Sequence, residues 1–271
     1  MPELPEVETT RRGIEPHILN QTIQSVVVRD RRLRWPISKQ FDKQAPGSQI
    51  LSVERRSKYL LINTTNGCII LHLGMSGSLR VLKTDTPAIK HDHVDIVFSN
   101  HKIIRFHDPR RFGSLFWTKS DPLKHKLLLK LGPEPLDNIF SSEYLFLKSR
   151  GRKQNIKTFI MNSQIVVGVG NIYACESLFL AGIHPATIAG KISKARLSKL
   201  VDIIKMVLSK AITQGGTTLK DFTQADGKPG YFAQSLNVYG RENEACHRCE
   251  RPIKKITQGQ RSTFYCPKCQ R

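Results

Sequence analysis

Apolar residues recur with two different periods along this chain. Between about residues 23 and 117, short apolar runs follow one another closely, with glycine, proline or charged turns between them. Runs of this kind predict an antiparallel β-sandwich or barrel, and the Asn66-Gly67 pair is a strong hairpin signal. The expected strands are 23–28, 50–53, 59–63, 68–73, 79–82, 94–98, 103–106 and 114–117.

A helical period flanks this β-rich region on both sides. Pro5 suits the first turn of a helix, Glu6 and Glu8 suit its positive end, and the apolar residues between Leu4 and Ile18 fall roughly on one face. Beyond about residue 140 the apolar period becomes helical again. The helices expected there are 142–148, 156–161, 171–181 and 194–214, the last opened by Ser193. A short amphipathic helix is also expected over 121–131, before the rigid break at 132–135.

These elements indicate an α+β protein with several domains. A chain of 271 residues with 39% apolar residues can fill more than one core. We expect a β-sandwich domain with a flanking helix at 1–131, a linker and first helix at 132–150, a helical domain at 151–235 and a terminal hairpin at 236–271. The stretch from about 215 to 235 contains too many glycines and prolines for a regular element, which favours a mobile loop.

The charge balance narrows the class of partner. Lysine and arginine number 43 against 22 acidic residues, which gives a formal net charge of +21 and a pI near 10.0. Nucleic-acid-binding proteins carry this electrostatic signature. A secreted or membrane-surface cationic protein is the alternative. However, the chain begins with acidic residues, has no basic-then-apolar leader and has no run of about 18 apolar residues, so we expect a cytoplasmic protein.

Cysteine spacing is the most specific signal that spacing alone provides. Cys246 and Cys249 form one tight pair, and Cys266 and Cys269 form another, with sixteen residues between the pairs. This arrangement fits a four-thiolate zinc site in a reducing compartment better than a disulfide framework. Four protein ligands leave no open coordination position, so the zinc ion would be structural.

The segment between the two cysteine pairs is expected to form a hairpin. Residues 253–257 and 261–265 can pair about a turn at 258–260. Arg261 would then lie at the tip of the hairpin, where it could enter a DNA groove.

The first residues could supply a nucleophilic amine. If Met1 is removed, Pro2 becomes a secondary α-amine next to the carboxylate of Glu3. An α-amino group with a pKa near 7.7–8.0 is deprotonated at pH 7 roughly 400 times more often than a lysine with a pKa near 10.4. Such an amine can attack a sugar C1′ and form a Schiff base, while Glu3 protonates the sugar. A Pro-capped surface helix is the alternative interpretation.

Two glycine-containing loops carry apolar residues that require an explanation. Met75 lies in the segment LHLGMSG (71–77), and Phe112 lies in HDPRRFG (107–113). Large apolar groups are normally buried, so their position on loops favours wedges that enter a base stack when a nucleotide is flipped. Ordinary core packing is the alternative for both residues.

Three other segments offer weaker signals. Lys58 stands just before a strand, where it could reach a ligand or be a solvated charge. His91 and His93 flank an aspartate, but two histidines without a third ligand are more often surface residues than a metal site. Gly168 precedes the helix that begins at Asn171, and glycines in that position let backbone N–H groups approach a phosphate closely.

Several of these segments resemble one known family. The sequence PELPEVET at residues 2–9 resembles the amino terminus of the bacterial formamidopyrimidine-DNA glycosylases, which also act as abasic-site lyases. Further segments resemble the same family in the right order, and together they cover nearly the whole chain. The resemblance implies a catalytic β-sandwich at 1–131, a helix–two-turn–helix domain at 151–235 and a zinc-finger hairpin at 236–271. The loop at about 215–235 would cover the everted base.

The resemblance also implies a role for each candidate residue. Pro2 would be the nucleophile, Glu3 the acid, and Lys58 would assist proton transfer during β-elimination. Arg261 would contact the lesion phosphates and assist δ-elimination. The implied DNA contacts are His72, Met75, His91, Arg110, Phe112, Arg152, Asn171 and Tyr239. Among them, Met75 and Arg110 would occupy the space vacated by the flipped nucleotide, and Phe112 would wedge beside it. The four cysteines would hold one structural Zn2+, with no catalytic metal and no organic cofactor.

The expected function is base-excision repair. The enzyme would remove 8-oxoguanine and formamidopyrimidines from double-stranded DNA and then cut the strand, as a monomer in the bacterial cytoplasm or nucleoid and without a membrane partner. One alternative is the oxidised-pyrimidine branch of the same superfamily, whose amino terminus more often reads PEGP and which lacks the intact wedge triad. The other is a non-catalytic zinc-ribbon DNA-binding protein, for which Pro2 and Glu3 would be incidental.

Overall fold

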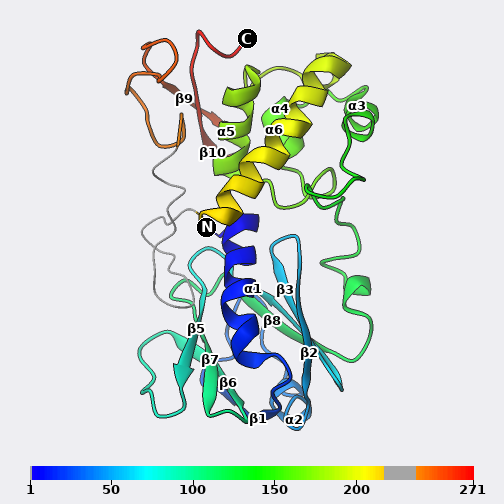
Figure 1. Cartoon of the computed structure of the whole chain (residues 1–271), viewed down its shortest axis with the longest axis vertical. Helices are drawn as coiled ribbons and strands as arrows, with labels where there is room; N and C mark the ends of the chain where they lie inside the picture. Colours follow the sequence, from blue (N-terminus) through cyan, green and yellow to red (C-terminus); the bar gives the residue numbers. More distant parts are fainter. Residues whose placement is uncertain (1, 217–235) are drawn as a thin grey trace. The chain divides into compact units, whose positions relative to one another are not determined.

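The computed structural model describes residues 2–216 and 236–271, which form two compact units (Figure 1). Unit 1 holds residues 2–129 and 214–216, and unit 2 holds residues 130–213 and 236–271. Most of the loop expected over residues 215–235 lies outside the described residues. In the part of the chain that the structure describes, no helix has the length and apolar character needed to cross a membrane.

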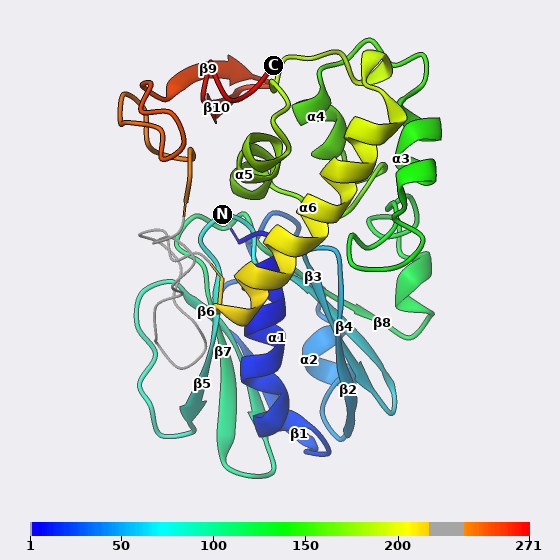
Figure 2. The same ribbon diagram turned by 45° about the horizontal axis from the view of Figure 1, so that its top comes forward.

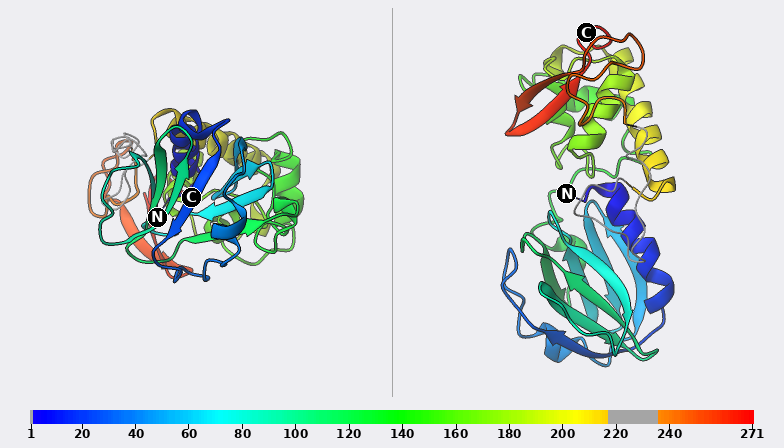
Figure 3. Two further views of the ribbon diagram at one scale, coloured as in Figure 1. Left: turned by 90° about the horizontal axis from the view of Figure 1, so that it is seen from below. Right: turned by 90° about the vertical axis from the view of Figure 1, so that its left-hand side faces the viewer.

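Unit 1 is built from two four-stranded antiparallel sheets. The strand orders are β1-β6-β7-β5 and β2-β3-β4-β8. The strands are β1 (Ile23–Val28), β2 (Ile50–Arg56), β3 (Tyr59–Thr64), β4 (Gly67–His72), β5 (Ser78–Lys83), β6 (Asp92–Phe98), β7 (Lys102–His107) and β8 (Ser114–Thr118). One apolar cluster takes side chains from both sheets, for example Ile69 and Ile104. The two sheets lie face to face (Figure 3, right). The predicted antiparallel sandwich, with its eight strands, is confirmed.

The β3–β4 hairpin turn differs by one residue from the prediction. Thr65 and Asn66 form the turn, because Gly67 already pairs with Thr64 as the first residue of β4. The Thr64 hydroxyl stabilises this turn by accepting hydrogen bonds from the N–H groups of Asn66 (3.3 Å) and Gly67 (3.1 Å). The glycine is needed for space instead, since a Cβ at Gly67 would lie 2.7 Å from the Trp117 ring.

Helix α1 (Leu4–Ile18) packs against strands of both sheets, including β2 and β5. Its buried apolar residues are Leu4, Val7, Ile14 and Ile18, which is the stripe that the sequence predicts. Glu8 ties the helix to β2, because Arg55 Nε donates to Glu8 Oε2 at 3.1 Å. Burial alone would raise the pKa of Glu8, but hydrogen bonds from Arg11 and Arg12 outweigh it and lower that pKa. A second, short helix, α2 (Phe41–Gln44), contacts β1.

Unit 2 is mainly helical. Its elements are α3 (Ser142–Ser149), α4 (Ile156–Ile160), the 3-10 turn η2 (Ala189–Lys191), α5 (Asn171–Ala181), α6 (Lys194–Thr213), β9 (Lys254–Gln258) and β10 (Arg261–Tyr265). Helix α5 contacts α6 and β10, which places the hairpin against the helices of this unit (Figure 2). Ser193 accepts from the N–H of Arg196 at 3.4 Å, so the predicted cap of α6 is confirmed.

The prediction of a helix over residues 121–131 is wrong. Only a 3-10 turn, η1 (Pro122–Lys124), forms there. Asp121 starts this turn by accepting from the N–H of Leu123, but His125 adopts extended backbone and ends it. Several of the apolar residues that suggested a helix stay exposed, since Leu123 and Leu129 are 51% and 65% exposed.

Candidate functional site

The Pro2-Glu3 pair is fixed at the start of α1. Glu3 is the N-cap residue and forms a reciprocal capping box with Glu6. The backbone N–H of Glu3 donates to Glu6 Oε2 at 2.8 Å, and the Glu3 side chain accepts from the backbone N–H of Glu6. Pro2 is buried, and Glu3 is only 2% exposed. Glu3 therefore caps the helix in addition to any chemical role, and the cap holds the preceding Pro2 in place.

Lys58 and His72 lie near one another on the second sheet. Lys58 belongs to the two-residue turn between β2 and β3. Tyr59 pairs with His72 across β3 and β4, with ring centroids 4.8 Å apart. Burial, followed by the charges of Lys58 and Arg34, lowers the pKa of His72 to about 4. The N–H of Gly74 donates to His72 Nδ1 at 2.9 Å, so the neutral ring carries its proton on Nε2, where it can donate to a phosphate.

Met75 and Phe112 lie on two loops that touch. They are 36% and 46% exposed, so neither is an ordinary core residue. The loops approach so closely that a Cβ at Gly74 would lie 2.4 Å from the backbone nitrogen of Gly113. Gly74 also has a φ of +69°, a conformation that favours glycine. Arg110 Nη2 donates to the carbonyl of Met75 at 3.3 Å. The three residues of the expected wedge triad are thus brought together within unit 1.

A buried aspartate that the sequence did not mark joins these two loops. Asp108 is 0% exposed; its Oδ1 accepts from Ser76 Oγ at 2.8 Å and its Oδ2 accepts from the N–H of Gly113 at 2.8 Å. Ser76 Oγ in turn accepts from the N–H of Arg110 at 3.3 Å. The carboxylate therefore connects the Met75 loop directly to the Arg110 loop. Glycines in both loops were the only sequence signal of this close approach.

His91 lies beside the second of these loops. It has a left-handed φ of 75°, and the N–H of Asp108 donates to its carbonyl at 3.1 Å. Its ring lies 6.4 Å from the His93 ring and 6.0 Å from the His107 ring. Desolvation and the nearby charge of Lys90 lower the pKa of His91. Among the described residues, the histidines do not join any cluster of three or more metal-ligating atoms.

In unit 2, Asn171 is bonded to the strand that carries Arg261. Asn171 begins α5, and its Nδ2 donates to the carbonyl of Ser262 at 2.9 Å. Lys157 on α4 is fully buried and donates from Nζ to the same carbonyl at 3.3 Å and to Thr263 Oγ1 at 2.6 Å. These bonds hold β10 against α4 and α5 immediately next to the exposed Arg261.

Tyr239 is positioned by a buried carboxylate that the sequence did not single out. Glu176 is 1% exposed, and its Oε1 accepts from the N–H groups of Val238 and Tyr239, both at 2.9 Å. Its Oε2 accepts from the backbone and side chain of Asn237 at 2.8 Å and 2.9 Å. The Tyr239 ring packs on Phe264 with a centroid distance of 5.1 Å. An isolated acidic residue in the apolar run of α5 was a signal that could have identified Glu176.

The candidate residues fall into two groups, one on each unit. Arg152 is exposed after α3, and its carbonyl accepts from the N–H of Gly190 at 3.1 Å. Unit 1 contains Pro2, Glu3, Lys58, His72, Met75, His91, Arg110 and Phe112. Unit 2 contains Arg152, Asn171, Tyr239, Arg261 and the four cysteines.

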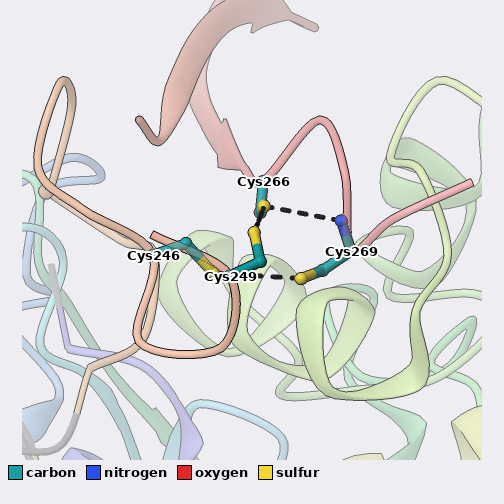
Figure 4. Close-up of side chains that lie close together, drawn as sticks. All are labelled: Cys246, Cys249, Cys266 and Cys269. Atoms are coloured by element: carbon teal, nitrogen blue, oxygen red, sulfur yellow. Dashed lines mark hydrogen bonds between the residues drawn. The ribbon is translucent and has the colours of Figure 1, made fainter. Parts of the chain in front are cut away.

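Cys246, Cys249, Cys266 and Cys269 form a candidate metal centre (Figure 4). Their four sulfur atoms all lie within 4.8 Å of one another, and the Cys249–Cys266 and Cys246–Cys269 separations are 3.4 Å and 3.9 Å. A tetrahedral zinc ion with Zn–S bonds of about 2.3 Å requires sulfur atoms about 3.8 Å apart, so the four thiols fit zinc. A hydrogen bond from the backbone of Arg251 lowers the pKa of Cys249 to about 7, whereas desolvation raises the pKa of Cys266 and of Cys269, so zinc binding would have to displace protons from these two thiols.

Family comparisons cover nearly all of the chain. Residues 1–115 match the Formamidopyrimidine-DNA glycosylase N-terminal domain. Residues 131–223 match the Formamidopyrimidine-DNA glycosylase H2TH domain. Residues 243–271 match the zinc finger found in FPG and IleRS.

Full-length relatives agree with these domain matches. The formamidopyrimidine-DNA glycosylase of Idiomarina loihiensis is 59% identical over 271 residues and covers 100% of both chains. The corresponding protein of Hydrogenovibrio crunogenus is 56% identical and covers 100% of this chain and 97% of its own.

Solved structures show the same similarity. The MutM (Fpg) protein of Thermus thermophilus has a TM-score of 0.89 and 38% identity, covering 99% of this chain and 98% of its own. The Lactococcus lactis Fpg in complex with abasic-site DNA has a TM-score of 0.92 and 35% identity, with 100% of both chains covered.

Proposed function

Because this chain belongs to the formamidopyrimidine-DNA glycosylase family, it is a base-excision-repair glycosylase that acts on damaged DNA, and we propose that the Pro2 amine performs its chemistry. Its substrates in this proposal are oxidised purines in duplex DNA, namely 8-oxoguanine and formamidopyrimidines. The observation that carries the proposal is the capped Pro2-Glu3 pair, which is held at the end of a helix docked on the sandwich.

The proposed reaction begins at the sugar of a flipped nucleotide. Once Met1 is removed, the deprotonated Pro2 amine attacks C1′, the bond from C1′ to the base breaks, and the base leaves with the proton that the amine loses. Glu3 donates a proton to the sugar as the ring opens, which gives an iminium between the Pro2 nitrogen and C1′. The positive iminium acidifies the C2′ proton, so β-elimination can follow, with Lys58 assisting proton transfer. Loss of the second phosphate by δ-elimination then completes strand cleavage, with Arg261 beside the phosphate.

The DNA contacts proposed here come from both units. His72 and His91 would contact backbone phosphates, and the Met75, Arg110 and Phe112 triad would fill the space left by the flipped nucleotide. Arg152, Asn171 and Tyr239 of unit 2 would bind phosphates near the lesion. Contact between these loops in unit 1 supports a joint role for the triad.

Zinc has a structural role in this proposal. The four cysteines would hold one zinc ion that stabilises the hairpin carrying Arg261. Four thiolates leave no coordination position for water or substrate, so the reaction is assigned to protein groups. We propose that this activity takes place in the bacterial cytoplasm or nucleoid, which the bacterial relatives and the DNA substrate support.

Borohydride trapping tests the proposal directly. The protein is incubated with duplex DNA containing 8-oxoguanine opposite cytosine, or an abasic site, and reduction should give a covalent adduct at Pro2. The protein is used with Met1 removed, and the matched control retains Met1, so that the Pro2 nitrogen is an unreactive amide. Salt-sensitive DNA binding without any adduct would instead identify a binding module. Faster removal of thymine glycol than of 8-oxoguanine would identify the oxidised-pyrimidine branch.

A further inference from the structure

Four arginines in a short segment of unit 1 differ in their partners. Arg29 pairs with Asp95 at 2.6 Å, and Arg31 pairs with Asp42 at 2.5 Å. Arg32 pairs with Asp30 at 2.9 Å, and Asp30 also pairs with Arg111 at 2.7 Å. No carboxylate of the described residues forms an ion pair with Arg34, the fourth arginine of the segment. Its charge is therefore not neutralised within the described part of the protein.

The Arg34 side chain is exposed but ordered. Its guanidinium carbon lies 4.8 Å from the centre of the Trp35 ring, which is within the range of a cation–π contact. Trp35 in turn packs against Phe116 of strand β8, with the two ring centroids 5.7 Å apart. A long cationic side chain normally loses rotamer freedom when it binds a ligand. The aromatic platform restricts Arg34 beforehand and so reduces that cost.

Arg34 is fixed next to the loop of residues 107–113, called here the wedge loop because it carries Arg110 and Phe112. Its backbone N–H donates to the carbonyl of Gly113 at 3.1 Å, and Gly113 directly follows Phe112. The Arg34 charge also contributes to lowering the pKa of His72 and opposes the burial effect that raises the pKa of Tyr59. Arg34 therefore shares one face of unit 1 with His72 and the wedge loop.

From this geometry we infer that Arg34 is a further DNA-binding residue, whose guanidinium binds a backbone phosphate of the duplex while Trp35 holds it in place. The ligand chemistry is a phosphodiester, which matches the planar donor fork of arginine. Because a phosphate contact carries no sequence information, Arg34 contributes affinity and orientation rather than recognition of the damaged base. The inference rests on the proposed action on duplex DNA.

The salt dependence of duplex binding tests this inference. Each phosphate neutralised by the protein changes the slope of log K against log salt by about 0.9. Arg34→Gln should therefore flatten the slope by about one such step, and Arg34→Lys should restore most of it because the charge is retained. The matched control is Arg32→Gln, which removes the same charge from the same segment. Arg32 already neutralises Asp30, so this control should leave the slope nearly unchanged.

A titration of His72 followed by NMR checks the placement of Arg34. The pKa of His72 should rise in Arg34→Gln and stay unchanged in Arg32→Gln, because of these two arginines only Arg34 contributes to lowering it. Equal slope changes in the two glutamine variants, or an unaltered slope in Arg34→Gln, would overturn the inference. Trapping with borohydride separates this failure from that of the proposed chemistry. Wild-type protein that binds DNA without forming an adduct refutes the Schiff base but leaves the Arg34 comparison valid.

Discussion

In unit 1 the loops that carry Met75 and Arg110 rest on an apolar core shared by two four-stranded sheets, whereas in unit 2 Arg261 begins one strand of a two-stranded hairpin. The core beside that hairpin is small and includes Cys246 and Cys266, two of the metal ligands. Unit 1 can therefore position its candidate residues by packing and buried hydrogen bonds. The hairpin of unit 2 is held by hydrogen bonds from Lys157 and Asn171, and we expect zinc to supply the rest of its support. The candidate residues of the two units are thus held by different means, and loss of zinc should affect only those of unit 2.

The largest expected effect is the loss of zinc, which should disrupt unit 2 and leave unit 1 folded. Cys266→Ser removes one zinc ligand and should unfold the hairpin, because structural zinc supplies apparent free energies of about 10–16 kcal/mol to small modules. Duplex affinity should be abolished, since the strand that carries Arg261 loses its support. Zinc content, DNA binding and circular dichroism of the β-sheets would be measured together. Retained duplex affinity in zinc-free protein would refute dependence on the metal.

A change at Lys58 tests chemistry in unit 1 without disturbing its scaffold. Besides its role in β-elimination, Lys58 is proposed to lie beside the reacting sugar, so Lys58→Ala should reduce base removal by about a hundredfold, a usual size for the loss of one proton-transfer group. Cleavage of preformed abasic sites should fall less, because the base has already left. Single-turnover rates on the two substrates give the comparison, and Lys43→Ala, an exposed lysine on α2, is the control. Equal losses on both substrates would contradict the role given to Lys58.

A smaller effect is expected from the buried link between the two loops. In Asp108→Asn only one side-chain oxygen can accept, so Ser76 or Gly113 loses its partner at a cost of about 1–3 kcal/mol. Base removal should fall about tenfold because the wedge loops are less ordered, while the fold persists. Thermal unfolding and excision rates would be compared with those of Asp121→Asn, which alters an exposed aspartate. Wild-type excision by Asp108→Asn would show that the link does not order the loops.

The smallest expected effect concerns the pH dependence of the free energy of unfolding, and it comes from His72. Its pKa is about 4 in the folded protein, below its ordinary value of 6.5, so the unfolded chain takes up the proton first. The stability contribution is therefore complete above pH 6.5 and is lost as the pH falls toward 4, by at most about 3 kcal/mol. Urea unfolding across this range should show a slope that His72→Gln removes. An identical pH dependence in the variant would contradict the assignment.

Periodicity and spacing predicted most of the framework. All eight strands, the helices α1 and α3–α6, and the cysteine module follow from patterns with a fixed physical period or a fixed ligand spacing. The 121–131 region was wrong because its apolar residues satisfy a helical spacing without having a surface to cover. In that segment the cap at Asp121 and the extended backbone at His125 determine the local structure, and periodicity predicts neither of them.

The connections within the candidate site were less accessible from the sequence. Asp108 and Ser76 are 32 positions apart, and no periodic signal relates them. Glu176 could be noticed as a charge in an apolar helix, but its partners after residue 236 could not be inferred. Arg34 was hidden among other arginines, because only the structure distinguishes neutralised guanidinium groups from one that has no carboxylate partner among the described residues.

The ladder between β5 and β7 has a consequence beyond the core. Ser78 pairs with His107 at the end of the ladder, directly beside the loops joined by Ser76 and Asp108. A slip of one residue would shift the strands by about 3.4 Å and reverse which side chains face inward. That shift exceeds the 2.8 Å length of the bond between Ser76 and Asp108. The pairing register of these two strands thus sets the distance between the Met75 and Arg110 loops.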